Sequence, residues 1–232
     1  MFTPLHFAVQ NNREEAVKLL LSFTEGNATK RIDINRQDER GNTALMWTSL
    51  KGYTEIAKLL IDTGADLNSR NGCNGTALSL ASYNGRTEIV KLLIDAGTDL
   101  NLQDDWNNTA LILASFKNHA DMVKLLIAAG ADLNLKTDQD KTALCMASDI
   151  GHTKIVELLI NAGADLNLQD ESKNTALILA SHKGHTKIAK LLADAGADLN
   201  LRDIRDRTAL MCASQKGYTK IFKLLTDAGA IV

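Results

Sequence analysis

The chain has 232 residues, of which 45% are hydrophobic and 23% are charged, and its formal net charge is −2. This composition is typical of a soluble globular protein, and the small net charge gives no general attraction to nucleic acid or to an anionic membrane. Because the apolar runs are only a few residues long, no segment is expected to cross a bilayer.

A short sequence pattern recurs along the chain from its first residues. It opens as Thr3-Pro4-Leu5-His6, a start with neither charge nor a long apolar stretch, so no secretory signal is expected. The first step of the pattern, from Thr3 to Thr43, is seven residues longer than the later ones, and the polar stretch 22–31 predicts a lengthened loop that holds this insertion. From Thr43 on, the pattern is Thr-Ala-Leu and recurs every 33 residues, at Thr43, Thr76, Thr109, Thr142, Thr175 and Thr208.

Each repeat is predicted to form two helices, as the repeat that begins at residue 38 illustrates. The hydroxyl of Thr43 can cap a first helix, which Gly52 ends. A second helix is expected from about residue 54 to about residue 62, since Ile56 and Leu60 have the spacing of one helix face. Gly64 follows its C-terminus, and a polar turn then leads into the next repeat.

The whole chain is expected to form one solenoid over residues 1–232. A repeat of this size cannot bury its apolar face alone, and stacking on its neighbours creates a continuous core. The alanine after each threonine, as at Ala44 and Ala77, allows adjacent helices to approach closely. The expected repeats are 1–37, 38–70, 71–103, 104–136, 137–169, 170–202 and 203–232.

Two segments carry a resemblance to a known family: residues 38–45, Asp-Glu-Arg-Gly-Asn-Thr-Ala-Leu, and residues 151–167, which run from Gly-His-Thr-Lys to Gly-Ala-Asp-Leu-Asn. Over nearly its whole length, the chain closely resembles the ankyrin repeat family. The resemblance implies an all-α solenoid of seven helix–turn–helix repeats with β-hairpin-like fingers and a concave face for protein recognition. The family's Thr-Pro-Leu-His survives only at Thr3 to His6, so its threonine–histidine hydrogen bond is expected to be absent from the other six repeats.

Residues of chemical interest recur with the repeat, which argues against a catalytic or metal site. His119, His152 and His185 stand 33 residues apart. Equivalent positions of neighbouring repeats lie roughly 10 Å apart, too far for one zinc ion, so these histidines are predicted to stabilise turns between repeats. Aspartates such as Asp66 recur as turn residues, and the chain has no GxSxG, HExxH or glycine-rich phosphate motif. We therefore expect no enzyme, no cofactor and no metal.

The three cysteines, Cys73, Cys145 and Cys212, are far apart and form no CxxC pair. This arrangement indicates a reducing, cytoplasmic compartment and no disulfide scaffold. No histidine is positioned near them in the sequence, so each cysteine is interpreted as an apolar structural residue.

The positions that vary between repeats are the predicted binding surface, because positions that face a partner are free to change. They are the turn and the end of the first helix, which by resemblance line the concave groove. Tyr83, Trp106 and Phe116 are aromatic at these positions and are predicted to form a contact patch; alternatively, the rings only cover the seam between repeats. The candidate partner-binding residues are Arg40, Trp47, Leu50, Lys51, Tyr83, Asn84, Asp105, Trp106, Phe116, Lys117, Asp149, His182 and Arg205.

The C-terminal third is more basic than the rest of the chain. Its second helices carry two lysine pairs that are expected to repel, Lys187 with Lys190 and Lys220 with Lys223. This charge could steer an acidic partner surface, and a solvated lysine-rich face is the alternative. Nucleic acid is not expected as a partner, because the chain as a whole is not basic.

The sequence thus predicts a monomeric, cytoplasmic, non-catalytic module that binds a protein partner as a scaffold, an adaptor or an inhibitor. One alternative is a regulatory ankyrin part of a larger multidomain enzyme or channel, and another is a microbial effector secreted into a host cell. A spacer without a groove ligand is a third, against which the variable positions argue.

Overall fold

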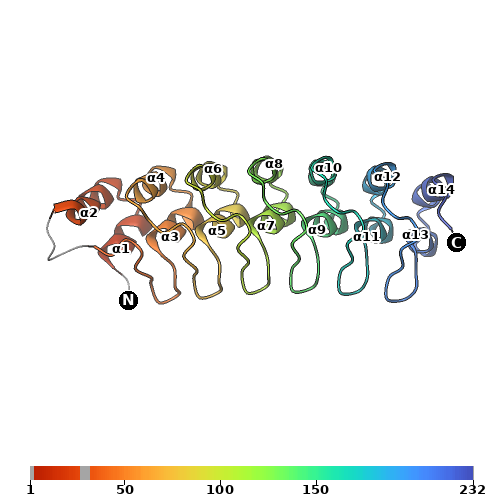
Figure 1. The fold of residues 1–232 in the computed structure, drawn as a ribbon, viewed down its shortest axis with the longest axis horizontal. Helices are drawn as coiled ribbons and strands as arrows, with labels where there is room; N and C mark the ends of the chain where they lie inside the picture. Colours follow the sequence, from red (N-terminus) through yellow and green to blue (C-terminus); the bar gives the residue numbers. More distant parts are fainter. Residues whose placement is uncertain (1–2, 27–31, 232) are drawn as a thin grey trace. The chain divides into compact units, whose positions relative to one another are not determined.

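The computed structural model describes residues 3–26 and 32–231. These residues form fourteen α-helices and no strands, and the helices follow one another in seven pairs (Figure 1). None of the helices is long and apolar enough to span a membrane. The chain divides into two compact units, Met1–Ala110 and Leu111–Val232, and the division falls at the start of α7 (Ala110–Phe116).

The N-terminal unit contains two rows of helices (Figure 1). In the first row α1 packs beside α3 and α3 beside α5, and in the second row α2 packs beside α4 and α4 beside α6. Each helix of the first row also packs on the helix that follows it in the chain. The bounds are α1 Pro4–Gln10, α2 Glu14–Gly26, α3 Ala44–Lys51, α4 Thr54–Asp62, α5 Ala77–Tyr83 and α6 Thr87–Asp95.

The C-terminal unit has the same arrangement. One row places α11 between α9 and α13, and the other contains α8, α10, α12 and α14 in this order. Its helices after α7 are α8 Ala120–Ala128, α9 Ala143–Ile150, α10 Thr153–Asn161, α11 Ala176–Lys183, α12 Thr186–Asp194, α13 Ala209–Gln215 and α14 Thr219–Asp227.

The helix boundaries confirm the predicted start and stop signals. Thr43 is the N-cap of α3, and its hydroxyl accepts a hydrogen bond from the backbone N–H of Met46 at 3.3 Å. Gly52 ends the same helix with a φ of 87°, a left-handed conformation that suits glycine. Asn12 and Asn118 occupy this position in two other repeats and have φ values of 52° and 61°. Asparagine tolerates this conformation better than most residues.

A five-residue hairpin-like turn, the finger, precedes the first helix of each repeat after the first. In the first finger the backbone N–H of Asp38 donates to the carbonyl of Asn42 at 2.9 Å. The Asp38 carboxylate accepts from the backbone N–H groups of Arg40 and Asn42 at 2.8 and 2.9 Å. Within each unit, neighbouring fingers are joined by a backbone bond, as from Ile204 N–H to the Ser172 carbonyl at 2.9 Å. The fingers are 38–42, 71–75 and 104–108 in the N-terminal unit and 137–141, 170–174 and 203–207 in the C-terminal unit.

Small and aliphatic residues form the core, and polar side chains link successive repeats. Ile155 and Leu159 of α10 have no exposed surface. The amide oxygen of Asn134 accepts from the backbone N–H of Asp165, one repeat later, at 3.0 Å. The carboxylate of Asp165 accepts in turn from the backbone N–H of Asn167 at 2.8 Å, which confirms the aspartates of this column as turn residues.

Two of the three recurring histidines, His152 and His185, act as predicted. The ring nitrogen Nε2 of His152 lies 3.3 Å from the carbonyl of Phe116, and Nε2 of His185 lies 3.2 Å from the carbonyl of Asp149. Each ring therefore satisfies a free carbonyl at the end of the preceding repeat's first helix.

Three details predicted from the sequence need correction. The predicted loop at 22–31 is wrong up to residue 26, because α2 continues to Gly26; no glycine or proline interrupts it earlier, and residues 27–31 lie outside the described part. Cys73 is exposed on a finger, so it is not an apolar structural residue, whereas Cys145 and Cys212 are buried as predicted. The threonine–histidine bond is absent from the repeat of Thr76, as expected, and the hydroxyl of Ser79 takes its place by accepting from the backbone N–H of Thr76 at 2.8 Å.

The third correction concerns the two lysines of α12, which were expected to repel. Lys187 forms an ion pair with Glu157 of the preceding repeat at 3.3 Å, and Lys190 forms one with Asp194 at 2.6 Å. Each lysine therefore has its own carboxylate partner. Lys220 and Lys223 form no ion pair with any residue in the described part of the chain.

Candidate functional site

The fingers and the C-terminal ends of the first helices lie on one face of each unit. The indole N–H of Trp47 on α3 donates to the Asp38 carboxylate of the finger at 2.9 Å. In the C-terminal unit, Lys141 of a finger pairs with Asp149 of α9 at 3.3 Å. We call this surface the recognition face. It comprises the fingers together with residues 47–51 and 80–84 in one unit, and with residues 113–117, 146–150, 179–183 and 212–216 in the other.

In the N-terminal unit, Trp47 supports the first finger. Its ring is half-buried, and with Gln10, Asp38, Glu39 and Arg40 it lines a hollow of about 260 Å³. Burial opposes ionisation of the Asp38 carboxyl, but hydrogen bonds from Asn42, Trp47 and Arg40 outweigh it and lower its pKa. Trp47 therefore has a structural role in addition to any role in binding.

The other candidates of this unit vary in how far they reach into solvent. Leu50 is half-buried and Lys51 is exposed. Asn84 is half-buried, and its side-chain amide donates to the Leu80 carbonyl at 2.7 Å. Arg40 at the finger tip is exposed.

Tyr83 and Trp106 are the two predicted aromatic contact residues of the N-terminal unit, and both are exposed. Tyr83 ends α5 and is 43% exposed, and Trp106 at a finger tip is 54% exposed. The backbone around Trp106 is held firmly, because its N–H donates to the Asp104 carboxylate at 2.9 Å and the N–H of Asp105 donates to the Cys73 carbonyl at 3.1 Å. An exposed ring on a fixed backbone is typical of a contact residue.

Phe116 and Lys117 belong to the C-terminal unit. The Phe116 ring is 42% exposed, and the ammonium group of Lys117 lies 5.3 Å from its centroid, within the range of a cation–π contact. Because Trp106 and Phe116 lie in different units, the predicted patch of Tyr83, Trp106 and Phe116 stays a prediction.

A network of charged side chains occupies the rest of this face in the C-terminal unit. Asp149 receives Lys141 at 3.3 Å and Lys183 at 3.6 Å, so two cations share one carboxylate. Burial opposes ionisation of Asp203, yet its hydrogen bonds with Arg207, at 2.7 Å from the guanidinium, lower its pKa.

His182 of α11 lies among these cations. Its pKa is lowered by burial and then by the charges of Lys216, Arg207 and Lys183, while Asp149 acts in the opposite direction. Its ring nitrogen Nδ1 is buried and has no hydrogen-bond partner among the described residues. Arg205 lies at the exposed tip of the last finger.

Two further apolar side chains, which were not among the predicted partner-binding residues, are exposed on the recognition face. Ile150 at the end of α9 is 39% exposed, and Ile204 at the tip of the last finger is 67% exposed. Both occupy variable positions of the repeat, which was the signal that could have identified them.

The comparison with known proteins agrees with this geometry. A family model described as ankyrin repeats in three copies matches residues 2–71, 78–170 and 144–232. The chain belongs to the ankyrin repeat family. A crystal structure of the ankyrin repeat domain of Bcl-3, described as a unique member of the IkappaB protein family, is similar to this ankyrin repeat chain with a TM-score of 0.87 and 26% sequence identity. The similarity covers 97% of this chain and 98% of the Bcl-3 domain.

Proposed function

We propose that this ankyrin repeat chain is a non-catalytic module that binds a protein partner through the recognition face and acts as a scaffold, an adaptor or an inhibitor. In this proposal the protein is monomeric and works in the cytoplasm. Ankyrin repeats generally mediate contacts between proteins, and the Bcl-3 domain is an example of the same fold.

The distribution of exposed apolar side chains carries the proposal. Between the first repeat and the last helix pair, the described large apolar residues that are exposed all lie at a finger tip or at the end of a first helix. They are Tyr83, Trp106, Phe116, Ile150 and Ile204. The second helices α4, α6, α8, α10 and α12 expose no such residue in their described positions.

This restriction to the recognition face of each unit is informative because single apolar residues scattered over a surface are ordinary. Between the first repeat and the last helix pair, every position of the repeat recurs equally often, yet the described large apolar side chains are exposed only at positions where the sequence also varies. Aromatic and aliphatic side chains with fixed backbones are suited to anchor a partner protein.

Site-specific photo-crosslinking tests the proposal. Benzoylphenylalanine placed at Trp106 or at Phe116 should give a crosslinked partner in lysate of the cells that naturally make the protein. The same amino acid at the exposed Lys91 of α6, on the second row of helices, is the matched control and should give none. Equal yields of the same product from all three positions would contradict the proposal.

The double variant Trp106→Ala with Phe116→Ala provides the quantitative test. We expect the dissociation constant for the partner to rise at least about tenfold, since each truncated anchor removes buried contact area. The melting temperature should change little, because both side chains are exposed. An unchanged dissociation constant would remove these two residues from the proposed surface.

A further inference from the structure

Positive charge accumulates on the recognition face of the last two repeats. Lys183, Arg205, Arg207 and Lys216 are cations there, and Asp203 is the carboxylate that Arg207 binds. We call the four cations the basic patch.

Two cations of the basic patch have no carboxylate partner among the described residues, although Glu171 and Asp206 also lie on the fingers of these two repeats; Asp206 pairs with Arg202 at 3.0 Å. Lys183 shares Asp149 with Lys141, so that carboxylate already serves two lysines. Arg205 and Lys216 are exposed and form no ion pair with the residues that the structure describes. Their charge is therefore available to a ligand.

An apolar side chain lies within the same surface. Ile204 precedes Arg205 at the tip of the last finger and is 67% exposed. Its backbone is fixed by the bond from its N–H to the Ser172 carbonyl at 2.9 Å. A phosphate backbone would gain little from this side chain, whereas a protein segment with an apolar residue would bury it.

We infer that the basic patch binds an acidic segment of a partner protein, in which several Asp or Glu residues accompany an apolar side chain. The inference rests on the proposed function and names the chemical class of the partner for the C-terminal unit. Charge complementarity supplies the attraction and the selectivity, and Ile204 supplies an apolar contact that fixes the segment on the finger.

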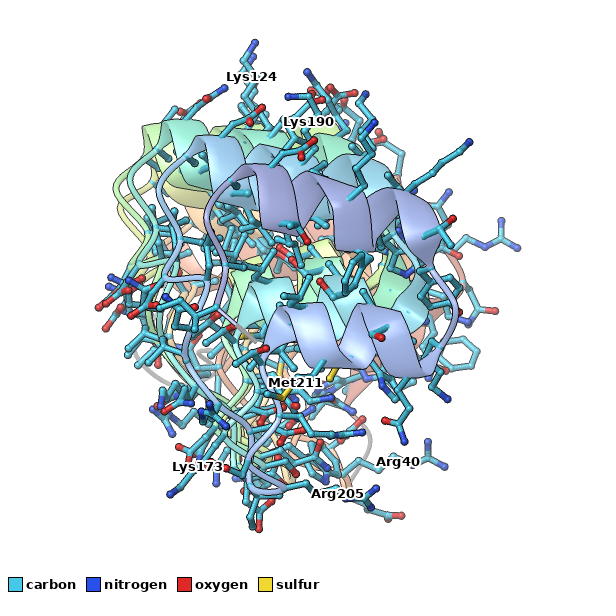
Figure 2. The ribbon with its side chains drawn as sticks, turned by 90° about the vertical axis from the view of Figure 1, so that its right-hand side faces the viewer. Arg40, Lys124, Lys173, Lys190, Arg205 and Met211 are labelled. Carbon is cyan, nitrogen blue, oxygen red and sulfur yellow. The ribbon has the colours of Figure 1, made fainter. Side chains whose placement is uncertain are left out.

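Two variants with the same change of charge test whether the basic patch itself is the binding site. The triple variant Lys183→Glu, Arg205→Glu and Lys216→Glu reverses the patch but keeps Arg207, which holds the buried Asp203. The control variant Lys124→Glu, Lys220→Glu and Lys223→Glu makes the same change of charge on exposed residues of the second helices. Figure 2 shows Lys124 and Arg205 on opposite sides of the protein.

A peptide-display selection on the whole chain, with a random dodecapeptide library, supplies the probes. The enriched peptides should contain more Asp and Glu than the unselected library. Synthetic versions should bind the patch variant at least about tenfold more weakly than the wild type, and the control variant within about threefold, because a distant surface contributes only screened charge. Circular dichroism should show that both variants are folded.

The other outcomes separate the inference from the proposed function. Peptides that are no more acidic than the library, but that lose affinity in the Trp106→Ala, Phe116→Ala variant, would overturn the acidic segment and leave the recognition face intact. Equal weakening by both charge variants would overturn the patch as the site. A single-stranded RNA of twenty nucleotides that displaces the peptides and loses binding in the patch variant alone would assign the patch to nucleic acid. Failure to enrich any peptide would contradict both proposals.

Discussion

Replacement of Gly151 by alanine tests how closely two repeats approach at the end of a first helix. Gly151 caps α9 with a φ of 100°, and an added Cβ would lie 2.7 Å from Cε1 and 3.0 Å from Nε2 of His185. The ring of His185 is not free to move away, since its Nε2 lies 3.2 Å from the Asp149 carbonyl. Gly163 is the matched control, with a φ of 85° and no heavy atom within 4 Å of an added Cβ.

Both substitutions place alanine at a positive φ, and only Gly151→Ala also crowds the ring of His185. Alanine at positive φ costs about 1–2 kcal/mol in either position. Only Gly151→Ala must also displace His185, and the strained hydrogen bond and crowding add about 1 kcal/mol. Asn118 occupies the equivalent position before His152 and has a φ of 61°, compared with 100° at Gly151. A smaller positive φ therefore accommodates a side chain at this position of the repeat. We therefore expect losses in the free energy of unfolding of about 2–3 kcal/mol for Gly151→Ala and about 1–2 kcal/mol for Gly163→Ala.

Urea unfolding followed by circular dichroism measures both losses, and coincident tryptophan fluorescence would show that the transition is two-state. The His185→Ala background provides the decisive comparison. Without the ring, the substitutions at Gly151 and Gly163 should cost the same. Equal losses in the wild-type background, or a difference that persists without His185, would refute the close approach as the cause.

Two further predictions concern the C-terminal unit. Lys173 has a φ of 57° in its finger, so Lys173→Gly should raise the free energy of unfolding by about 0.5–1 kcal/mol, and a melting temperature that does not rise would contradict this. The pKa of His182 is lowered in the folded protein by burial and by Lys216, Arg207 and Lys183, so the unfolded chain binds a proton more readily. The free energy of unfolding should therefore include the full contribution of neutral His182 at pH values above its ordinary pKa of 6.5. This contribution should be lost as the pH falls below that value, because the unfolded chain then takes up a proton first. His182→Gln should flatten this part of the stability profile, and an unchanged profile would assign it to another group.

The repeat made most of the fold predictable from the sequence. The threonine and glycine columns mark the ends of the helices, because capping and left-handed conformations are local requirements that few residues meet. The asparagines that replace glycine at residues 12 and 118 meet the same requirement and adopt positive φ. The length of α2 was missed because the polar composition of residues 22–26 resembles a loop, while nothing in it ends a helix before Gly26.

Contacts between repeats were harder to predict. The ion pair of Lys187 with Glu157 joins residues 30 positions apart, and helix-based reasoning compared Lys187 only with its own helix. The ion pairs of Asp149 with Lys141 and Lys183 likewise join a helix, a finger and the first helix of the next repeat. Spacing within one helix does not predict such contacts. For the candidate site, variation along the repeat indicated the finger and helix-end positions as candidates, but only the structure separates Trp47, which donates a hydrogen bond to its finger, from Trp106, which is exposed.

In the proposed function, the fixed and the variable positions of the repeat have separate roles: the fixed positions hold the fold, and the variable positions contact the partner. Backbone bonds between neighbouring fingers and carboxylates such as Asp203 hold the finger tips, so the tip side chains are not needed for the shape of the finger. Ile204 and Trp106 are 67% and 54% exposed and therefore contribute little to the free energy of unfolding. Replacing them should alter binding without altering folding, whereas replacing Asp203 should alter both. Under the proposed function, a repeat protein with this division changes its partner by substitutions at the tips alone, which would account for the variation of those positions among repeats with similar frameworks.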